Sequence, residues 1–318
     1  MKERFAICLA CALCILAACG PKKTAKQPQL TRDFPSVEIP SMITEPQERM
    51  VWLSQHFWDR FTAPENLYYC DSVTVNGVKV DDLEKQVGIY TTLIQEIAPA
   101  DGIRAMENMY DRMEAFQLKN PEGNLFQWLT DKVSDYLYDP NSPLRSEEMY
   151  LPLATRLSKS SLVDPVLRKR YAWEANKCSL NRLGTKAADF QFIDTEGRKR
   201  TLHGIVAPLT ILIFGNPDCE ACKEIQEVIS GIPELSAAID EGEIKVVDIY
   251  IDEDIEAWKA KKDSYPSSWI NGYDPSHIIR EDLIYNIRAI PSIYLLDADK
   301  TVLLKDASPQ MLFSALGL

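Results

Sequence analysis

Histidine, positive charge and long apolar runs are all scarce in this chain of 318 residues. With 3 histidines in all and no cluster of Cys and His, the sequence does not predict a zinc site, and we expect no metal. Asp and Glu number 47 against 35 for Lys and Arg, and the formal net charge of −12 argues against a nucleic-acid partner. The apolar run at residues 5–18 is too short to cross a membrane as a helix, so we expect no transmembrane anchor.

The same apolar run has the features of a targeting segment, because basic residues precede it and small residues end it. Its end, Leu16-Ala17-Ala18-Cys19-Gly20, resembles the lipobox of bacterial lipoproteins. That resemblance implies a lipoprotein signal peptide at residues 1–18, a lipid on Cys19, and a lipid-anchored protein of the cell envelope that faces the periplasm. Gly20 stands where some inner-membrane lipoproteins carry Asp, which favours the outer membrane. The alternative is an ordinary secretory signal cleaved at an A-x-A-like site.

Residues 19–41 are polar and interrupted by prolines, so we expect a flexible tether there. Removal of residues 1–18 takes three of the 8 cysteines with it. Cys70 and Cys178 remain in the region that follows the tether. They form either a structural disulfide that joins the first and last segments of that region or two separate buried thiols.

Residues 42–180 predict an all-α helical domain, because apolar residues recur at helical spacing and prolines separate the segments. We expect about six helices with short connections, in a bundle or a short superhelix. The methionine and aromatic stripes on these helices are interpreted as core rather than as a cofactor site.

The most informative motif is Cys219-Glu220-Ala221-Cys222. It follows the apolar run 209–214, which predicts a buried strand, and precedes the helix-like run 223–229. Two thiols at this spacing on the first turn of a helix can close a small ring, and the helix N-terminus favours a thiolate at the first cysteine. A second motif, Ile290-Pro291, stands at the start of another apolar run, residues 292–296. The arrangement is typical of thiol–disulfide exchange.

Together these motifs resemble the thioredoxin superfamily over residues 185–318. The resemblance implies an α/β thioredoxin-like domain with a central mixed sheet flanked by helices. It implies that Cys219 attacks a disulfide as the nucleophile, that Cys222 resolves the mixed disulfide, and that no cofactor is needed beyond the redox-active disulfide of this pair. It also implies a cis Pro291 that faces the cysteines, with the backbone of Ile290 offered to an incoming peptide.

Three further stretches complete the interpretation. Residues 187–197 resemble the opening hairpin of TlpA-like thiol–disulfide oxidoreductases. Residues 52–61 and the helical pattern after them resemble a domain of unknown function that precedes thioredoxin-like modules in some bacterial lipoproteins, which implies no activity. Residues 252–288 are interpreted as an insertion of helices, whose aromatic side chains either cover an edge of the core or face a partner.

The motif departs from the usual thioredoxin pattern. Thioredoxins usually carry Trp before the first cysteine and an acid in the preceding strand, where this chain has Asp218 and Ile213, and no proline stiffens its turn. We expect like-charge repulsion from Asp218 and Glu220 to disfavour the Cys219 thiolate, which makes the dithiol a better reductant. Glu224 is a third acid close enough to modulate the thiols, with its orientation left open.

The sequence therefore predicts an enzyme, a membrane-anchored thiol–disulfide oxidoreductase that reduces or isomerises disulfides of exported proteins. Its partners would be the thiols or disulfides of those proteins and an electron donor that the sequence does not identify. The alternative is a non-catalytic binding or redox-sensing lipoprotein whose helical domain engages a partner protein. A peroxidase of the same fold is disfavoured, because the single-cysteine context with a nearby Thr and Arg is missing.

Overall fold

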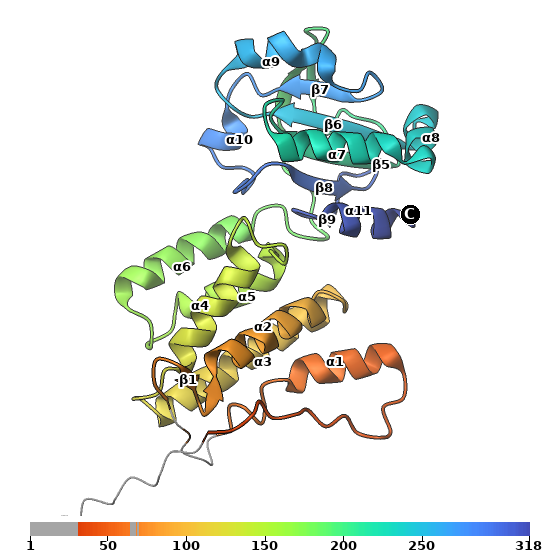
Figure 1. Cartoon of the computed structure of the whole chain (residues 1–318). Helices are drawn as coiled ribbons and strands as arrows, with labels where there is room; N and C mark the ends of the chain where they lie inside the picture. Colours follow the sequence, from red (N-terminus) through yellow and green to blue (C-terminus); the bar gives the residue numbers. More distant parts are fainter. Residues whose placement is uncertain (1–30, 64–67, 69) are drawn as a thin grey trace, which may run out of the picture.

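A computed structural model describes residues 31–63, 68 and 70–318, which form a helical N-terminal region and a C-terminal α/β domain (Figure 1). The expected signal peptide, Cys19 and the first part of the tether lie outside the described residues. No helix within the described ranges combines the length and the apolar character that crossing a membrane requires.

The N-terminal region packs its helices around one apolar core, as the spacing of apolar residues predicts. The core includes Trp58, Phe61, Tyr90, Met106 and Tyr150, all fully buried, which confirms that the methionine and aromatic stripes are core. The helices are α1 (Pro46–His56), α2 (Val80–Leu93), α3 (Pro99–Lys119), α4 (Leu125–Tyr138), α5 (Glu147–Leu157) and α6 (Pro165–Cys178).

A small hairpin interrupts the all-helical pattern and corrects the expectation for this region. Strand β1 (Thr74–Val75) pairs antiparallel with β2 (Val78–Lys79). Asn76 and Gly77 between them have φ angles of 45° and 83°, which the tight turn of a two-residue hairpin needs and which Asn and Gly adopt most readily. The Asn-Gly pair is the sequence signal for this hairpin.

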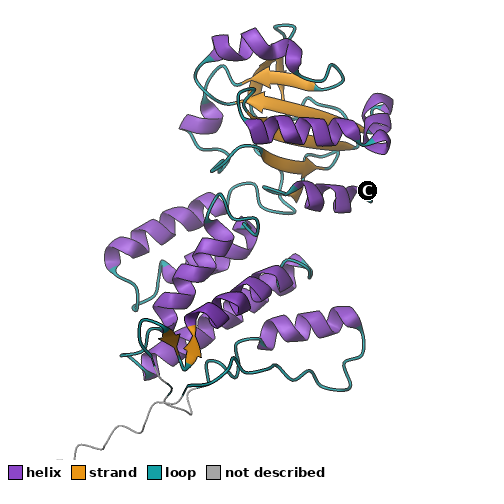
Figure 2. Cartoon of the chain, viewed as in Figure 1, coloured by secondary structure: helices purple, strands orange, loops and turns teal. Residues whose placement is uncertain are grey.

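The strands of the C-terminal domain form one central sheet with helices around it (Figure 2). This mixed sheet has seven strands in the order β4-β3-β7-β6-β5-β8-β9. Strands β5, β6 and β7 are parallel, whereas β8 is antiparallel to β5. This arrangement confirms the expected mixed sheet. The strands are β3 (Gln191–Asp194), β4 (Lys199–Thr201), β5 (Leu209–Gly215), β6 (Ile244–Tyr250), β7 (Ile270–Tyr273), β8 (Ser292–Leu296) and β9 (Val302–Leu304).

Apolar clusters cover both faces of this sheet. Helices α7 (Glu220–Gly231), α8 (Pro233–Glu241) and α11 (Pro309–Leu316) bury their apolar side chains against one face. On the other face, aromatic residues of the strands pack with residues 187–192 and with α10 (Ile278–Glu281). The core thus fixes the strand ends at which the cysteine motif and Pro291 lie.

The stretch 252–288 is not purely helical, which corrects the expectation from sequence. It contains α9 (Ile255–Lys261), a short 3-10 helix η1 (Lys262–Ser264) and α10, but also strand β7, which joins the sheet beside β6. Trp258 and Tyr265 are buried in a cluster with Tyr250. These aromatics therefore cover an edge of the core, which is one of the two alternatives.

Candidate active site at the start of helix α7

The two cysteines of the motif lie where the chain leaves β5 and begins α7. Cys219 is the N-cap residue of α7, and its sulfur accepts a hydrogen bond from the Cys222 N–H at 3.2 Å. Cys219 is partly exposed, whereas Cys222 is 3% exposed because the first helical turn carries it beneath the surface. Burial, with the Cys219 sulfur as a further cause, raises the pKa of the Cys222 thiol. An accessible thiol thus has a buried, protonated thiol one turn behind it.

The second motif lies beside the first, because Pro291 precedes the strand that neighbours β5. The Ile290–Pro291 bond is cis, as the resemblance implies, and it leads directly into β8, the neighbour of β5. The Cys219 sulfur lies 3.8 Å from the carbonyl oxygen of Ile290, within hydrogen-bonding distance for a thiol. Residues 71 positions apart are thereby brought together at one point of the surface.

Sequence reasoning missed one acid of this site. Asp248 lies on β6 opposite Ile213 of β5, so the neighbouring strand supplies the acid that β5 lacks. A Cβ on Gly215 would lie 3.5 Å from Asp248 Oδ1 and 3.6 Å from the Cys222 sulfur. The carboxyl group and the thiol therefore both lie next to Gly215. The available signal is a single charged residue within the otherwise apolar end of this strand, residues 246–250.

Asp248 is a weak acid because of its surroundings. Its side chain is buried, and burial raises its pKa from 3.8 to about 7. The Gln226 amide donates a hydrogen bond to Oδ2 at 3.3 Å, which favours the charged form and opposes this rise. Near neutral pH this carboxyl group can therefore both accept and return a proton.

The acid before the motif is paired. Asp218 forms an ion pair with Lys261 at the end of α9. Its backbone N–H donates to Asn216 Oδ1 at 2.8 Å, and the Asn216 amide in turn donates to Asp252. Arg280 of α10 donates to the same Asp252 carboxylate at 2.6 Å. These contacts hold the loop that leads to Cys219 against residues 252–281, and Lys261 offsets the negative charge that we expect to act on the thiolate.

The other two acids of the motif point to solvent. Glu220 is exposed and forms an ion pair with Lys223 at 3.6 Å. Glu224 is exposed as well, because a step of two residues along a helix turns its side chain about 200° away from Cys222. Neither carboxylate hydrogen-bonds to a thiol in the part of the chain that the structure describes. The structure therefore does not bring Glu224 to the thiols, and Asp248 takes the place that it was expected to fill.

The remaining cysteines lie in the helical region. Cys178 ends α6 and is buried, and Cys70 lies partly exposed in a loop. Both are free thiols, so no disulfide joins them. Of the expected pair of separate buried thiols, Cys178 is buried, whereas Cys70 is only partly buried.

A cavity opens beside the cis proline. It has a volume of about 210 Å³ and borders Ile290 directly. Apolar residues, including Ile251, Ile279 and Ile287, supply most of its wall. The charged residues of the wall are paired, Arg280 with Asp252 of the same wall and Arg288 with Glu147. Such a cavity can take an apolar side chain of a peptide whose backbone lies against Ile290.

Comparison with known proteins agrees with this geometry. Residues 18–181 match the family model called "Domain of unknown function (DUF5106)". A thioredoxin-like protein from Bacteroides caccae, solved by crystallography, is 30% identical, with a TM-score of 0.77 over 90% of this chain and 98% of its own. No functionally curated protein matches the chain in sequence.

Solved single domains match less than half of this chain and nearly all of their own length. The C-terminal domain of an uncharacterized protein from Bacteroides fragilis is 40% identical over 43% of this chain and 99% of its own, with a TM-score of 0.42. A domain of a "possible thiol-disulfide isomerase" from Cytophaga hutchinsonii is 27% identical over 44% and 93%, with a TM-score of 0.36.

The sheet, the dithiol at a helix start and the cis proline define a thioredoxin-like domain of the thiol–disulfide oxidoreductase type. With the match over residues 18–181, the chain belongs to the DUF5106 family, in a form that carries this thioredoxin-like domain after the helical region.

Proposed function

We propose that the protein is a lipid-anchored thiol–disulfide oxidoreductase that reduces or isomerises disulfides of exported proteins. The observation that carries the proposal is the accessible Cys219 sulfur at the start of α7, 3.8 Å from the Ile290 carbonyl, with the Cys222 thiol buried behind it. The helix N-terminus favours a thiolate at Cys219. Ile290 and Pro291 offer the backbone against which a substrate peptide binds.

The reaction begins at Cys219. Its thiolate attacks one sulfur of the substrate disulfide, the substrate S–S bond breaks, and the other substrate sulfur leaves as a thiolate. A mixed disulfide between Cys219 and the substrate remains. In an isomerase cycle, a second substrate thiolate attacks this bond and regenerates Cys219 without net electron transfer.

The reductive cycle ends at Cys222. This thiol passes its proton to Asp248, and its sulfur attacks the Cys219 sulfur. The bond from Cys219 to the substrate breaks, and the second substrate sulfur leaves as a thiolate while Cys219 and Cys222 become a disulfide. The substrate, now with two more electrons, becomes a dithiol as its two thiolates take one proton from Asp248 and one from water. A dithiol electron donor, most simply another protein, then reduces this disulfide by the reverse exchange.

The test of the enzyme is insulin reduction with a chemical reductant. The wild-type protein is expected to accelerate the reaction, and Cys219→Ser to abolish the acceleration. Cys222→Ser should instead trap mixed disulfides, because the attacking thiol survives without the resolving one. Mass spectrometry of the trapped species would identify the substrates. Exchange by Cys219→Ser at the wild-type rate would contradict the proposal.

The anchor and the location rest on Cys19 and the sequence before it. In cells, the wild-type protein should be found in the outer-membrane fraction with a diacylglyceryl Cys19 at its N-terminus. Cys19→Ala should yield unprocessed precursor or protein released from the membrane. A variant that is processed and fractionates like the wild type would contradict lipidation.

The second candidate function is a binding or redox-sensing module, and one surface of α6 favours it. Val166 and Trp173 of this helix are 73% and 53% exposed, although both are large and apolar. Side chains seven residues apart share one helix face, which suits a protein partner. If the wild-type protein does not accelerate insulin reduction and Cys222→Ser traps nothing, this module is the better account.

A further inference from the structure

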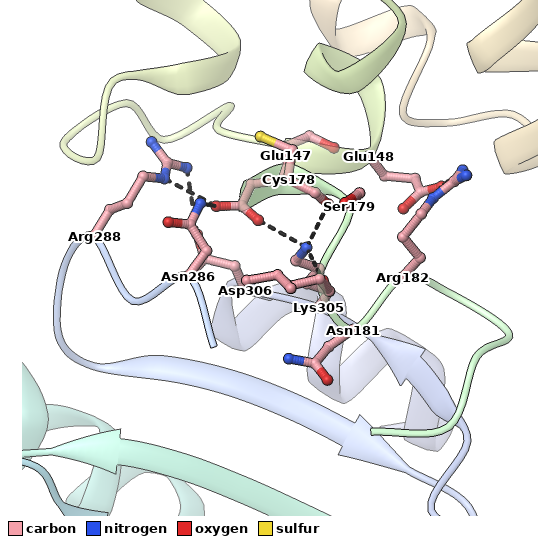
Figure 3. A network of polar contacts seen from close by, with 12 residues as sticks. Glu147, Glu148, Cys178, Ser179, Asn181, Arg182, Asn286, Arg288, Lys305 and Asp306 are labelled. Atoms are coloured by element: carbon pink, nitrogen blue, oxygen red, sulfur yellow. Dashed lines mark hydrogen bonds and ion pairs between the residues drawn. The ribbon is translucent and has the colours of Figure 1, made fainter. Parts of the chain in front are cut away.

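A buried carboxylate joins the helical region to the thioredoxin-like domain. Glu147 is the first residue of α5, and its side chain is 1% exposed. Three donors from the C-terminal domain converge on it (Figure 3). Arg288 Nε lies 3.0 Å from Oε1, Lys305 Nζ lies 2.8 Å from Oε2, and the Asn286 amide donates to Oε1.

The donors are themselves held by the helical region. Lys305 also donates to the carbonyl oxygens of Cys178, at 2.8 Å, and Leu180. The Arg288 guanidinium lies over the ring of Tyr138, 4.2 Å from its centroid, and donates to the Tyr138 carbonyl. Because buried charges need several well-placed partners, this geometry leaves the arginine little freedom.

Arg288 lies two residues before Ile290, on the loop that faces Cys219. The other end of this loop is also connected to the helical region. Ser292 donates a hydrogen bond to Asp306 Oδ1 at 3.2 Å, and Arg145, which precedes α5, donates to Asp306 Oδ2 at 3.0 Å. The loop 289–291 is thus held on both sides by side chains of residues 145–147.

We propose that the DUF5106 region is a positioning domain, which holds the cis-proline loop at its distance from Cys219 through Glu147 and Arg145. The proposal rests on the proposed function in one respect, that the loop receives the substrate. Glu147 touches neither substrate nor thiol, and it acts through Arg288 on the Ile290 carbonyl. The helical region then sets how well a peptide binds against the loop.

The test compares Glu147→Gln with a matched control at the next residue. Glu148 is also buried, and it pairs with Arg182 of the segment between the domains, at 3.0 Å from Nε, without a hydrogen bond to the loop. Glu148→Gln therefore removes the same charge from the same interface. Hydrogen exchange of the 287–292 peptide measures how well ordered the loop is, and the KM for insulin reduction measures how well the loop binds a substrate.

Glu147→Gln is expected to speed amide exchange in residues 287–292 and to lower kcat/KM by about 10- to 100-fold, mostly through a higher KM, because a small displacement of a substrate-positioning group has effects of this size. Glu148→Gln should change neither. Alkylation of Cys219 by iodoacetamide should change far less than KM in either variant, since this small reagent does not bind against the loop. Glu147→Asp keeps the charge and should restore part of the KM.

Arg145→Met tests the other side of the loop if Glu147→Gln does not fold, because Arg145 is partly exposed. It should also speed exchange in the same peptide and raise KM. The proposal is overturned if these variants match Glu148→Gln in both readouts. A wild-type protein that does not reduce insulin would overturn the proposed function instead, and the hydrogen exchange would still decide whether Glu147 holds the loop.

Discussion

Two buried carboxylates, one beneath the dithiol and one between the domains, have opposite surroundings. Asp248 has one amide donor, Gln226, and its burial raises its pKa to about 7. Glu147 has two cations and an amide within hydrogen-bonding distance. A buried acid without a cation becomes a base that works near neutral pH, whereas a buried acid with several cations becomes a joint between elements.

The largest effect on stability is expected at the contact between the two domains, where Lys305 meets Glu147. Lys305→Met removes a cation whose side chain is 3% exposed, and it leaves the buried Oε2 atom of Glu147 without the ammonium group that lies 2.8 Å away. We expect a loss of about 3 to 5 kcal/mol in the free energy of unfolding, measured by urea denaturation. The double variant Glu147→Gln/Lys305→Met should lose less than the sum of the two single variants. Strict additivity would mean that the two side chains do not act as a pair.

Substitution of Asp248 is expected to raise the stability of the protein, whereas substitution of Lys305 lowers it. Its folded pKa, about 7, lies above its ordinary value of 3.8, so its contribution to stability is fully present below about pH 4 and is lost as the pH rises through 7. Asp248→Asn removes this loss and should be more stable than the wild type at pH 8, by up to about 4 kcal/mol.

The free energies of unfolding of the wild type and of Asp248→Asn, measured from pH 4 to 8, should become equal toward pH 4. The gain in stability should come with slower release of substrate, because the proton acceptor of Cys222 is gone. A variant less stable than the wild type at pH 8 would mean that Asp248 is compensated as Glu147 is.

Gly215→Ala adds a methyl group in contact with both the Asp248 carboxyl group and the Cys222 thiol without removing either. The added Cβ would meet Asp248 Oδ1 and the Cys222 sulfur at ordinary contact distances, so stability should change little. Release of substrate from the mixed disulfide should slow by roughly 10-fold, a part of what a positioned base contributes. Stopped-flow single turnovers measure this step. An unchanged rate would show that no proton passes between the two groups at this point.

The smallest effect is expected at Gln226. Gln226→Leu removes a hydrogen bond that favours the charged form of Asp248. The pKa of Asp248 should rise further, and the pH at which substrate release is half-maximal should move up by about 0.5 to 1 unit. Glu227→Leu, at the exposed next residue, is the matched control and should leave this pH unchanged. A shift to lower pH in Gln226→Leu would contradict the role of the amide.

The parts of this molecule that local sequence determines could be predicted from it. The dithiol at a helix start and the cis Pro291 follow from short motifs, and the mixed sheet follows from their order along the chain. The Asn76-Gly77 pair likewise predicts a hairpin, although its two strands are too short to stand out from the helical spacing of apolar residues around them.

The parts that depend on pairing across the sheet or between domains could not be predicted. Asp248 lies near Cys222 because β6 lies beside β5 in a particular register, and no spacing along the chain reveals that register. Glu147 and Lys305 are 158 positions apart by their numbering, and each alone is typical of a solvated surface. Their meeting follows from how the two domains pack.

In the proposed mechanism, Asp248 takes the proton of Cys222 when Cys222 resolves a mixed disulfide on Cys219. The most direct measurement is the rate of substrate release in single turnovers with a fluorescent disulfide peptide, followed from pH 5 to 9. We expect the wild-type rate to rise to a plateau with a midpoint near pH 7, the pKa of Asp248, and Asp248→Asn to lack this rise. The same profile in both proteins would rule out Asp248 as the proton acceptor of Cys222.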